Sequence, residues 1–156
     1  MQEWFDKYGE SHTNPMNKAI HWICVPSIFF SLIGILSLVP ISFGSELLPY
    51  YLQEQIHLGT LLIIFGLLFF WRLSKPITYG MLLISIIILK GVTQLHQMDL
   101  NVLTVCLWIF GIAWVGQFIG HKIEGAKPSF LDDLKFLLIG PAWLLSFIYQ
   151  KLGIKY

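Results

Sequence analysis

The stretch AIHWICVPSIFFSLIGILSLV, from Ala19 to Val39, decides the fold class of this chain. It has 21 residues and contains no Asp, Glu, Lys or Arg. A helix needs about 20 mostly apolar residues to cross the hydrocarbon core of a bilayer. The stretch therefore predicts a membrane-spanning helix near the start of the chain.

Three more apolar runs follow. Residues 56–71 end in three aromatic side chains, which are typical of a helix end at the membrane interface. Residues 77–89 span the membrane only if the helix tilts little and the Lys90 side chain extends to the interface, or if the helix continues toward Leu95. Residues 100–120 form a second uncharged run of 21 residues. We predict four spans, at about 19–39, 56–71, 77–95 and 100–120.

A fifth apolar segment, within residues 130–150, is interrupted by Gly140-Pro141. This break favours a re-entrant or interfacial element, with a broken fifth span as the alternative. The expected fold is an all-α polytopic membrane helix bundle that forms one domain over residues 1–156.

The composition agrees with a membrane protein. Hydrophobic residues make up 56% of the chain and charged residues only 12%, about half the charged fraction of a soluble domain. The net charge of +1 gives no electrostatic basis for nucleic-acid binding, which depends on many phosphate contacts. Cys24 and Cys106 lie inside apolar runs, so we expect buried thiols instead of a disulfide or a metal site.

The basic residues predict how the bundle is oriented. They gather before the first run, between the second and third, and after the fourth: Lys7, Lys18, Arg72, Lys75, Lys122, Lys127 and Lys135. The loop between the first two runs has none, so the positive-inside rule predicts that both termini are cytoplasmic. Four residues of metal-ligand type then share the cytoplasmic face: His12, His21, His121 and Glu124. His57 and His96 fall on the opposite face.

The first polar motif is YGESHTNPMNKAIH, from Tyr8 to His21. On one unbroken helix, His12 and His21 would point about 180° apart, because nine residues turn a helix through about 900°. Asn14-Pro15, however, is a favourable helix start, with Asn as N-cap and Pro at the first helical position. A break there releases His12 from the helical phase. Within the new helix, Asn17 and His21 are four residues apart and share a face.

The second polar motif is QFIGHKIE, from Gln117 to Glu124. The spacing places Gln117, His121 and Glu124 on one stripe of a helix. His and Glu three residues apart can bind one metal ion, or the carboxylate can orient the imidazole. Gly116 and Gly120 permit the close approach of a neighbouring helix.

Taken together, three imidazoles and one carboxylate at one face suit Fe(II), Zn(II) or a similar ion. Each motif alone also has a simpler interpretation. His12 would cap a turn, His21 would be an interfacial residue, and the second motif would be a polar helix end with a His–Glu hydrogen bond. Thr13 and Lys18 could contact an anionic lipid head group, as could Ser11.

Both motifs resemble signatures of a known family, the small integral-membrane Fe(II)-dependent 2-hydroxy fatty acid dioxygenases of fatty-acid α-oxidation. The resemblance covers nearly the whole chain, in matching order. Its first part consists of Tyr8, His12, Asn14-Pro15, Asn17, His21 and Val25-Pro26. Its second part consists of Gln117, Gly120, His121, Glu124 and Pro128, followed by Gly140-Pro141.

The resemblance implies that O2 and a 2-hydroxy fatty acid are the substrates, and that the acid is shortened by one carbon. It implies Fe(II) as the cofactor, with His12, His21 and His121 as ligands. Glu124 is implied as a fourth ligand or as a supporting partner, with Asn17 and Gln117 as supporting residues. Known members occur in fungal endoplasmic reticulum and in bacteria, so an endoplasmic reticulum or bacterial inner membrane location is expected.

Two other functions remain open on the residues alone. The same cluster, loaded with Zn(II), would suit a membrane lipid hydrolase or another lipid-modifying enzyme. Alternatively, the protein is a non-enzymatic lipid-binding or assembly protein, in which the polar cluster only joins helices. Replacing His12, His21 or His121 would then leave metal content unchanged. The oligomeric state cannot be derived from this sequence.

Overall fold

The computed structural model describes residues 1–10, 12–41, 55–125 and 137–156. These residues form helices and no β-strand, apart from an isolated antiparallel bridge between Pro40 and His57. The helices are α1 (Gln2–Gly9), α2 (Pro15–Leu36), α4 (Leu58–Leu73), α5 (Lys75–Gln97), α6 (Val102–Glu124) and α8 (Ile139–Lys151). The predicted all-α class is therefore confirmed for the described residues.

The break between the two N-terminal helices lies where the sequence predicts it. α1 ends at Gly9 and α2 begins at Pro15, so His12 belongs to neither helix. Asn14 has an extended backbone conformation and its side chain accepts a hydrogen bond from the main-chain nitrogen of Met16, at 2.9 Å. This is the N-cap interaction that starts a helix at a proline.

The longer helices agree with three of the predicted spans. α2, α5 and α6 are each long and apolar enough to cross a membrane. α5 runs from Lys75 to Gln97 and so supplies the extension past Leu89 that a span requires. α4 has only 16 residues, about 24 Å of helix, and the fourth predicted span stays a prediction.

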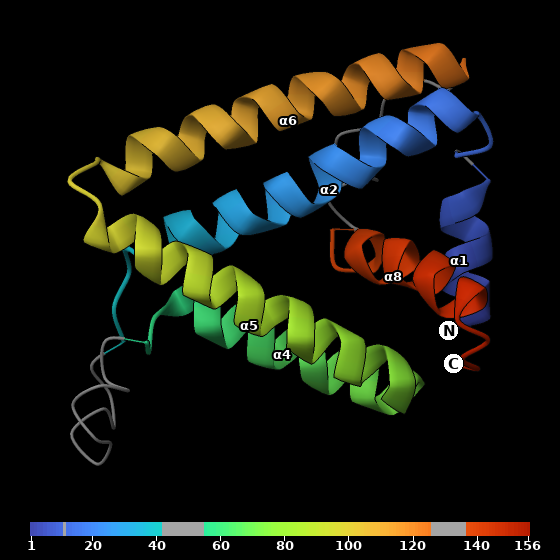
Figure 1. Cartoon of the computed structure of the whole chain (residues 1–156), viewed down its shortest axis with the longest axis horizontal. Coiled ribbons are helices and arrows are strands. Elements are labelled where there is room, and N and C mark those ends of the chain that lie inside the picture. The colour runs from blue at the N-terminus through green and yellow to red at the C-terminus, as the bar shows by residue number, and fades with distance from the viewer. Residues whose placement is uncertain (11, 42–54, 126–136) are drawn as a thin grey trace.

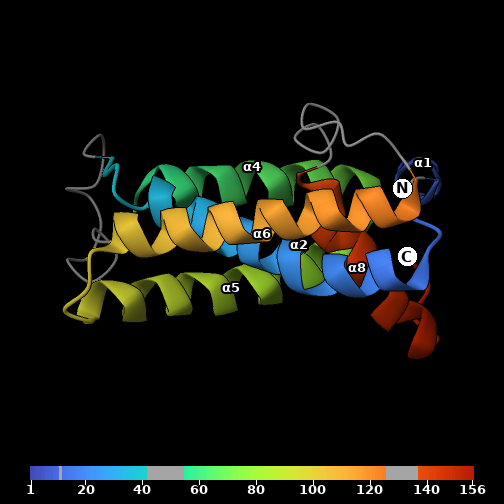
Figure 2. The same ribbon diagram turned by 90° about the horizontal axis from the view of Figure 1, so that it is seen from above.

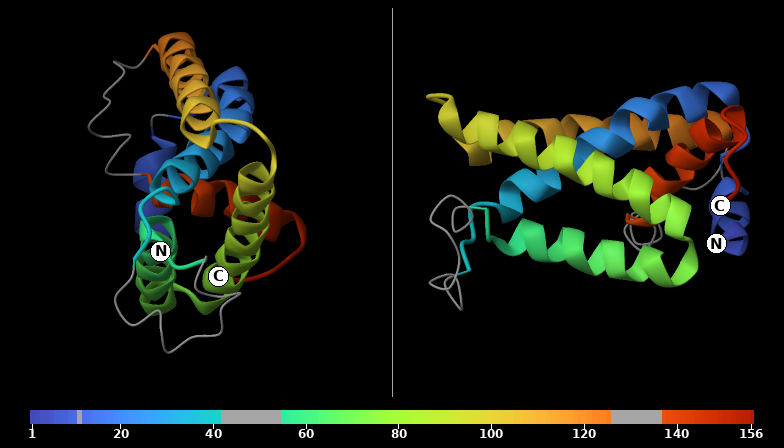
Figure 3. Two further views of the ribbon diagram at one scale, coloured as in Figure 1. Left: turned by 90° about the vertical axis from the view of Figure 1, so that its left-hand side faces the viewer. Right: turned by 60° about the horizontal axis from the view of Figure 1, so that its bottom comes forward.

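α2 is the central helix of the bundle (Figures 1 and 2). It packs against α6 along one side and contacts the paired helices α4 and α5 on the other. Both termini lie at one end of the elongated bundle, where α1 packs against α8 (Figure 3). That end also holds the start of α2, the end of α6 and the turn between α4 and α5 (Figure 1).

α8 fills the space between α1, α2 and α5 at this end of the bundle. Its first eight residues, Ile139–Ser146, are all buried, and Gly140-Pro141 lies in its first turn. Proline is tolerated there because the first-turn N–H groups have no partner within the helix. The Gly-Pro pair therefore starts this helix and does not interrupt it. Thirteen residues give about 20 Å, too short for a complete span, while its re-entrant or interfacial character stays a prediction.

The outer surface of α4, α5 and α6 is strongly apolar. Exposed apolar side chains in this number suit contact with lipid. The exposed side chains include Ile64, Phe65, Leu68, Leu83, Ile87, Trp108, Ile112 and Val115.

Several sequence-based expectations fall outside the described residues. They concern Ser11, Pro128, the basic residues Lys127 and Lys135, most of the loop between the first two runs, and residues 130–136 of the C-terminal segment.

Candidate metal centre

Three histidines from three different segments meet at the end of the bundle that carries both termini. His12 comes from the segment between α1 and α2, His21 from the second turn of α2, and His121 from the last turn of α6. Their side chains are 1%, 0% and 3% exposed. The ring centroids of His12 and His21 are 4.3 Å apart, and each is 5.2 Å from that of His121. One nitrogen from each ring lies within 4.8 Å of the other two.

The main chain determines which nitrogens carry protons. Nδ1 of His12 lies 2.6 Å from the carbonyl oxygen of Tyr8, and Nδ1 of His21 lies 2.9 Å from that of Asn17. A carbonyl oxygen only accepts, so both Nδ1 atoms must donate. Each neutral ring therefore has its lone pair on Nε2. Hydrogen bonding of the non-coordinating nitrogen is the usual way in which a protein orients a metal-binding imidazole.

The two Nε2 atoms face each other across 2.9 Å. Two lone pairs at this distance repel unless a proton or a metal cation lies between them. Metal–imidazole bonds are about 2.1 Å long, so two nitrogens bound to one ion at about a right angle would lie about 3.0 Å apart. With His121 as a third nitrogen donor and no thiolate in the group, the cluster fits a borderline divalent ion such as Fe(II) or Zn(II).

Two aromatic residues enclose His12. The Tyr8 ring stacks on the His12 ring, with centroids 4.3 Å apart and planes 15° apart. The Trp143 ring of α8 packs against both, at 5.1 Å from Tyr8 and 5.3 Å from His12. Sequence reasoning did not identify either as a site residue. The four-residue spacing from Tyr8 to His12 was an available signal, but nothing in the sequence pairs Trp143 with His12.

Glu124 ties the two motifs together. Its carboxylate accepts hydrogen bonds from the main-chain nitrogens of Thr13 (2.7 Å) and Asn14 (3.0 Å), from the Thr13 hydroxyl, and from the Asn17 amide (2.9 Å). The carboxylate thus holds the segment that follows His12 against the end of α6. It is not one of the residues whose ligand atoms gather within 4.8 Å. Hydrogen bonds to a charged carboxylate, such as those that Glu124 accepts, are among the stronger hydrogen bonds in proteins.

Small residues let α2 and α6 approach closely beside the cluster. A Cβ atom added to Gly120 would overlap Oδ1 of Asn17, and one added to Gly116 would lie 2.6 Å from Sγ of Cys24. The predicted close approach at these glycines is confirmed. α6 ends at Glu124, and the next residue, Gly125, has a φ of 77°, the left-handed conformation that glycine adopts readily after a helix end.

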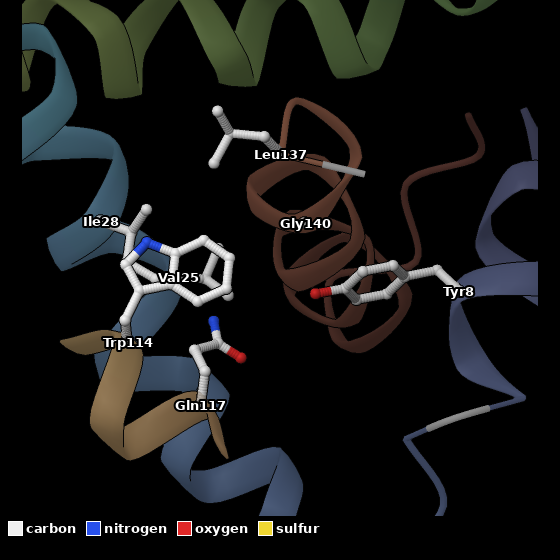
Figure 4. A pocket seen from close by; sticks show the side chains of 7 residues that line it. All are labelled: Tyr8, Val25, Ile28, Trp114, Gln117, Leu137 and Gly140. Atoms are coloured by element: carbon white, nitrogen blue, oxygen red, sulfur yellow. The ribbon is translucent and has the colours of Figure 1, made fainter. Parts of the chain in front are cut away.

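Gln117 lies one helical turn before His121, beside a small cavity on the inner side of the cluster. The cavity wall also includes Tyr8 and Val25, which are one turn from His12 and His21 respectively. The Gln117 amide points into this space (Figure 4). Its Oε1 atom is buried and has no hydrogen-bond partner among the described residues. The cavity, of about 20 Å³, is large enough for one water molecule, the usual partner of such an atom.

The remaining candidates are not brought to this site. His57 and His96 lie at the opposite end of the bundle, which confirms the predicted segregation of the histidines. Cys24 and Cys106 are buried and form no disulfide with each other, as expected from their apolar surroundings.

Comparison with known proteins now adds to this geometry. The family model described as "2-hydroxy-palmitic acid dioxygenase Mpo1-like" matches residues 1–152. The chain belongs to this family. A Saccharomyces cerevisiae member, 2-hydroxy-palmitic acid dioxygenase MPO1, is 30% identical over 150 residues, which cover 94% of this chain and 78% of the yeast protein. No solved structure matches the chain with significant similarity.

Membership of the Mpo1-like family confirms two predictions made from the sequence motifs, namely the family itself and the dioxygenase class of enzyme. The identity of the metal and the set of ligands are not tested by this membership. They stay predictions, although the histidine cluster offers a suitable place for a metal ion.

Proposed function

We propose that this protein is an Fe(II)-dependent dioxygenase that shortens 2-hydroxy fatty acids by one carbon. The single observation that carries the proposal is the pair of Nε2 atoms, from His12 and His21, held face to face with their protons directed away. The name of the yeast relative supplies the substrate class, a long-chain acid with a 2-hydroxyl group.

In this proposal His12, His21 and His121 are the iron ligands. Iron held by these residues would supply redox chemistry with O2 and would bind the polar end of the substrate. The chain itself contributes three things. Main-chain carbonyls orient two of the imidazoles, the aromatic rings of Tyr8 and Trp143 shield His12 from water, and Glu124 keeps the His12 segment in place.

Of the two roles considered for Glu124, the hydrogen bonds support that of a supporting partner. Both carboxylate oxygens already accept bonds from Thr13, Asn14 and Asn17. Asn17 has a double supporting role, because its carbonyl accepts from His21 and its amide donates to Glu124.

The reaction is balanced with O2 as the only co-substrate. Conversion of a 2-hydroxy acid to the acid one carbon shorter and CO2 releases four electrons, and one O2 accepts four electrons on reduction to water. The overall equation is R–CH(OH)–COOH + O2 → R–COOH + CO2 + H2O. The proposed activity therefore requires no reductase and no oxo-acid co-substrate.

We further propose that the whole chain forms one membrane domain in which α4 is a fourth span. Arg72 and Lys75, in the turn between α4 and α5, lie at the same end of the bundle as the histidine cluster. By the positive-inside rule this end is cytoplasmic, in a bacterial inner membrane or the endoplasmic reticulum. A substrate chain can then remain in the bilayer while its polar end reaches the cluster.

The direct test is anaerobic reconstitution of metal-free protein with Fe(II), followed by 2-hydroxypalmitate and O2. We expect pentadecanoic acid and CO2, detected by mass spectrometry, with one O2 consumed per acid formed. The Zn(II)-loaded protein should give no product, because Zn(II) has no redox chemistry. Equal product with Zn(II), or product in the absence of O2, would contradict the proposal.

A further inference from the structure

Two cavities border α8, and their chemistry differs: the first lies between α1, the start of α2 and α8, and the second lies between α2, α5 and α8. The first, of about 420 Å³, is polar and opens at the end of the bundle with both termini. Its lining includes His12 and Lys18 on one side and Ser146, Phe147 and Gln150 of α8 on the other. The cavity therefore reaches the histidine cluster directly.

The second cavity, of about 250 Å³, is lined only by apolar side chains. Trp22, Pro26 and Phe29 of α2 form one wall, and Leu144 and Ile148 of α8 form another. α5 closes the third side with Ile84, Ile87 and Ile88.

The two cavities lie next to each other, and together they are called the α2–α8 groove. Lys18 lines the polar part, and Trp22, one turn further along α2, lines the apolar part. Across the groove, Phe147 lines the polar part, and its ring centroid is 6.4 Å from that of Trp22. From Lys18 to Phe29 the groove follows α2 for about 16 Å, about half of the roughly 30 Å hydrocarbon core.

The packing of α8 against α5 accounts for the apolar part. At Gly80 the two helices touch, since a Cβ atom there would overlap the side chains of Leu145 and Tyr149. The Tyr149 hydroxyl also donates to the carbonyl oxygen of Pro76, at 2.8 Å. One turn further along α5, at Ile84, the cavity begins.

We propose that this α2–α8 groove binds the 2-hydroxy fatty acid substrate, and that its apolar part determines the preferred chain length. This inference rests on the proposed function. The carboxylate lies in the polar part, where Lys18 supplies a positive charge. His12 lines the same part, so the carboxyl end lies beside the histidine cluster. The acyl chain follows Trp22 and Pro26 into the apolar part. The lining of the groove changes from polar to apolar over the depth of about one membrane leaflet. This change suits an acid with a single acyl chain that enters from the membrane.

Of the acidic side chains that the structure describes, Asp6 alone lines the polar part. It accepts a hydrogen bond from the Gln2 amide at 2.7 Å and belongs to the exposed face of α1. Among the described residues the groove thus has one cation and one anion, and Lys18 is the group that distinguishes an acid from a neutral lipid.

The chain-length test uses a matched pair of substitutions on α5. Ile87 lines the apolar part and Ile86 does not, while both side chains are exposed to the bundle surface. We expect Ile87→Trp to weaken binding of 2-hydroxypalmitate by about tenfold, which corresponds to about 1.4 kcal/mol. This is the cost of excluding roughly two methylene groups of the acyl chain from the apolar part. Binding of 2-hydroxyoctanoate should be unchanged, and Ile86→Trp should behave as wild type with both acids.

Binding is measured by equilibrium dialysis of the acids against the iron-loaded protein under anaerobic conditions, and turnover is measured separately. A loss in Ile87→Trp that is equal for both acids, or equal to that in Ile86→Trp, would overturn the inference. So would displacement of 2-hydroxypalmitate by phosphatidylcholine at similar concentration. Chain-length-dependent binding without turnover would instead contradict the proposed function and leave the groove intact.

The carboxylate contact is tested by Lys18→Gln, with Lys7→Gln as the control for loss of one positive charge. Lys7 is exposed on α1 and does not line the groove. We expect Lys18→Gln alone to weaken the binding of acids of every chain length, with unchanged iron content. The same effect in Lys7→Gln would overturn the assignment of Lys18, because it would indicate a general electrostatic effect of the surface.

Discussion

Histidines occur at both ends of this bundle, but the two ends use their ring nitrogens in different ways. In the cluster, His12 and His21 donate from Nδ1 to main-chain carbonyls, so their Nε2 atoms converge. At the opposite end, Nδ1 of His57 accepts from the main-chain nitrogen of Thr60 at 3.2 Å and caps α4. Nε2 of His96 lies 2.7 Å from the Ser37 hydroxyl.

Burial alone does not separate the two ends. His57 is 5% exposed, almost as buried as the clustered histidines. The difference is the direction in which the fold places the lone pair. Where the lone pair meets a backbone N–H, the histidine has a structural role, and where lone pairs converge, the site suits a cation. This comparison leads to four predictions, and the first three compare substitutions at the two ends.

The largest expected effect is loss of the metal on removal of a clustered histidine. Iron content after reconstitution should fall from about one ion per chain to below about a tenth in His21→Ala and in His121→Ala, because a three-nitrogen site loses a ligand. His96→Ala should keep full occupancy. Metal analysis of the purified proteins measures this, and full iron retention in His121→Ala would exclude a shared site.

The next effect concerns the residues that orient the histidines. Glu124→Gln should lower iron affinity by about 10–100-fold, because it removes the charged acceptor that holds Thr13 and Asn14. Ser37→Ala, which removes the hydroxyl beside His96, should leave iron affinity unchanged. Titration with a competing chelator gives both values. Complete loss of iron in Glu124→Gln would make Glu124 a ligand instead of a supporting partner.

A third comparison uses two of the glycine contacts between α2 and α6. A Cβ atom at Gly120 would overlap Oδ1 of Asn17 near the cluster, and one at Gly34 would overlap Sγ of Cys106 near the other end. Alanine at either position should lower the free energy of unfolding by about 1–3 kcal/mol through overpacking. Denaturation in detergent micelles measures this cost.

Only Gly120→Ala should also weaken iron binding, because it displaces the residue that bonds both His21 and Glu124. Reduced iron affinity in Gly34→Ala would mean that general loosening of the α2–α6 contact, and not local geometry, controls the site.

The smallest effect is expected at His57. His57→Ala should lower the free energy of unfolding by about 1 kcal/mol through loss of the helix cap, with no change in iron content. Burial, with a smaller effect from the positive charge of His96, lowers the pKa of His57. The contribution of His57 to the stability of the wild-type protein should therefore weaken as the pH falls. The loss begins below about 6.5, the pKa of histidine in the unfolded chain, and continues toward the lower pKa of the folded state.

Unfolding of the iron-loaded protein between pH 7 and pH 5 measures the difference between wild type and His57→Ala. The difference in the free energy of unfolding between wild type and His57→Ala should become smaller at the lower pH, because folding then requires His57 to lose a proton. A difference that becomes larger at the lower pH would contradict the role of neutral His57 as a helix cap.

Much of the candidate site was predictable from local signals. Asn14-Pro15 marks a helix start by capping chemistry, and this placed His12 outside the helix. The spacing from Gln117 to Glu124 predicted one stripe of α6, and the charges of the loops predicted which histidines share an end. These signals depend only on residues that are near each other in the sequence, so they can be interpreted without knowledge of the tertiary packing.

Other features depended on contacts between distant segments. Three of these features join residues more than 100 positions apart. They are the packing of Trp143 against His12, the role of Glu124 as acceptor for Thr13 and Asn14, and the groove between α2 and α8. Gly140-Pro141 was expected to interrupt a segment, and it begins a helix whose buried position no periodicity indicates.

By itself, the sequence determined an all-helical chain with long apolar helices, histidines divided between two ends, and the family to which the chain belongs. Hydropathy, capping and charge are properties of short stretches, so they can be read without coordinates. Only the tertiary structure decided that the clustered histidines direct their Nε2 atoms toward one point while His57 caps a helix. Each of these rings takes its backbone partner from within four residues of the chain, but only the packing of distant segments brings the three clustered rings together.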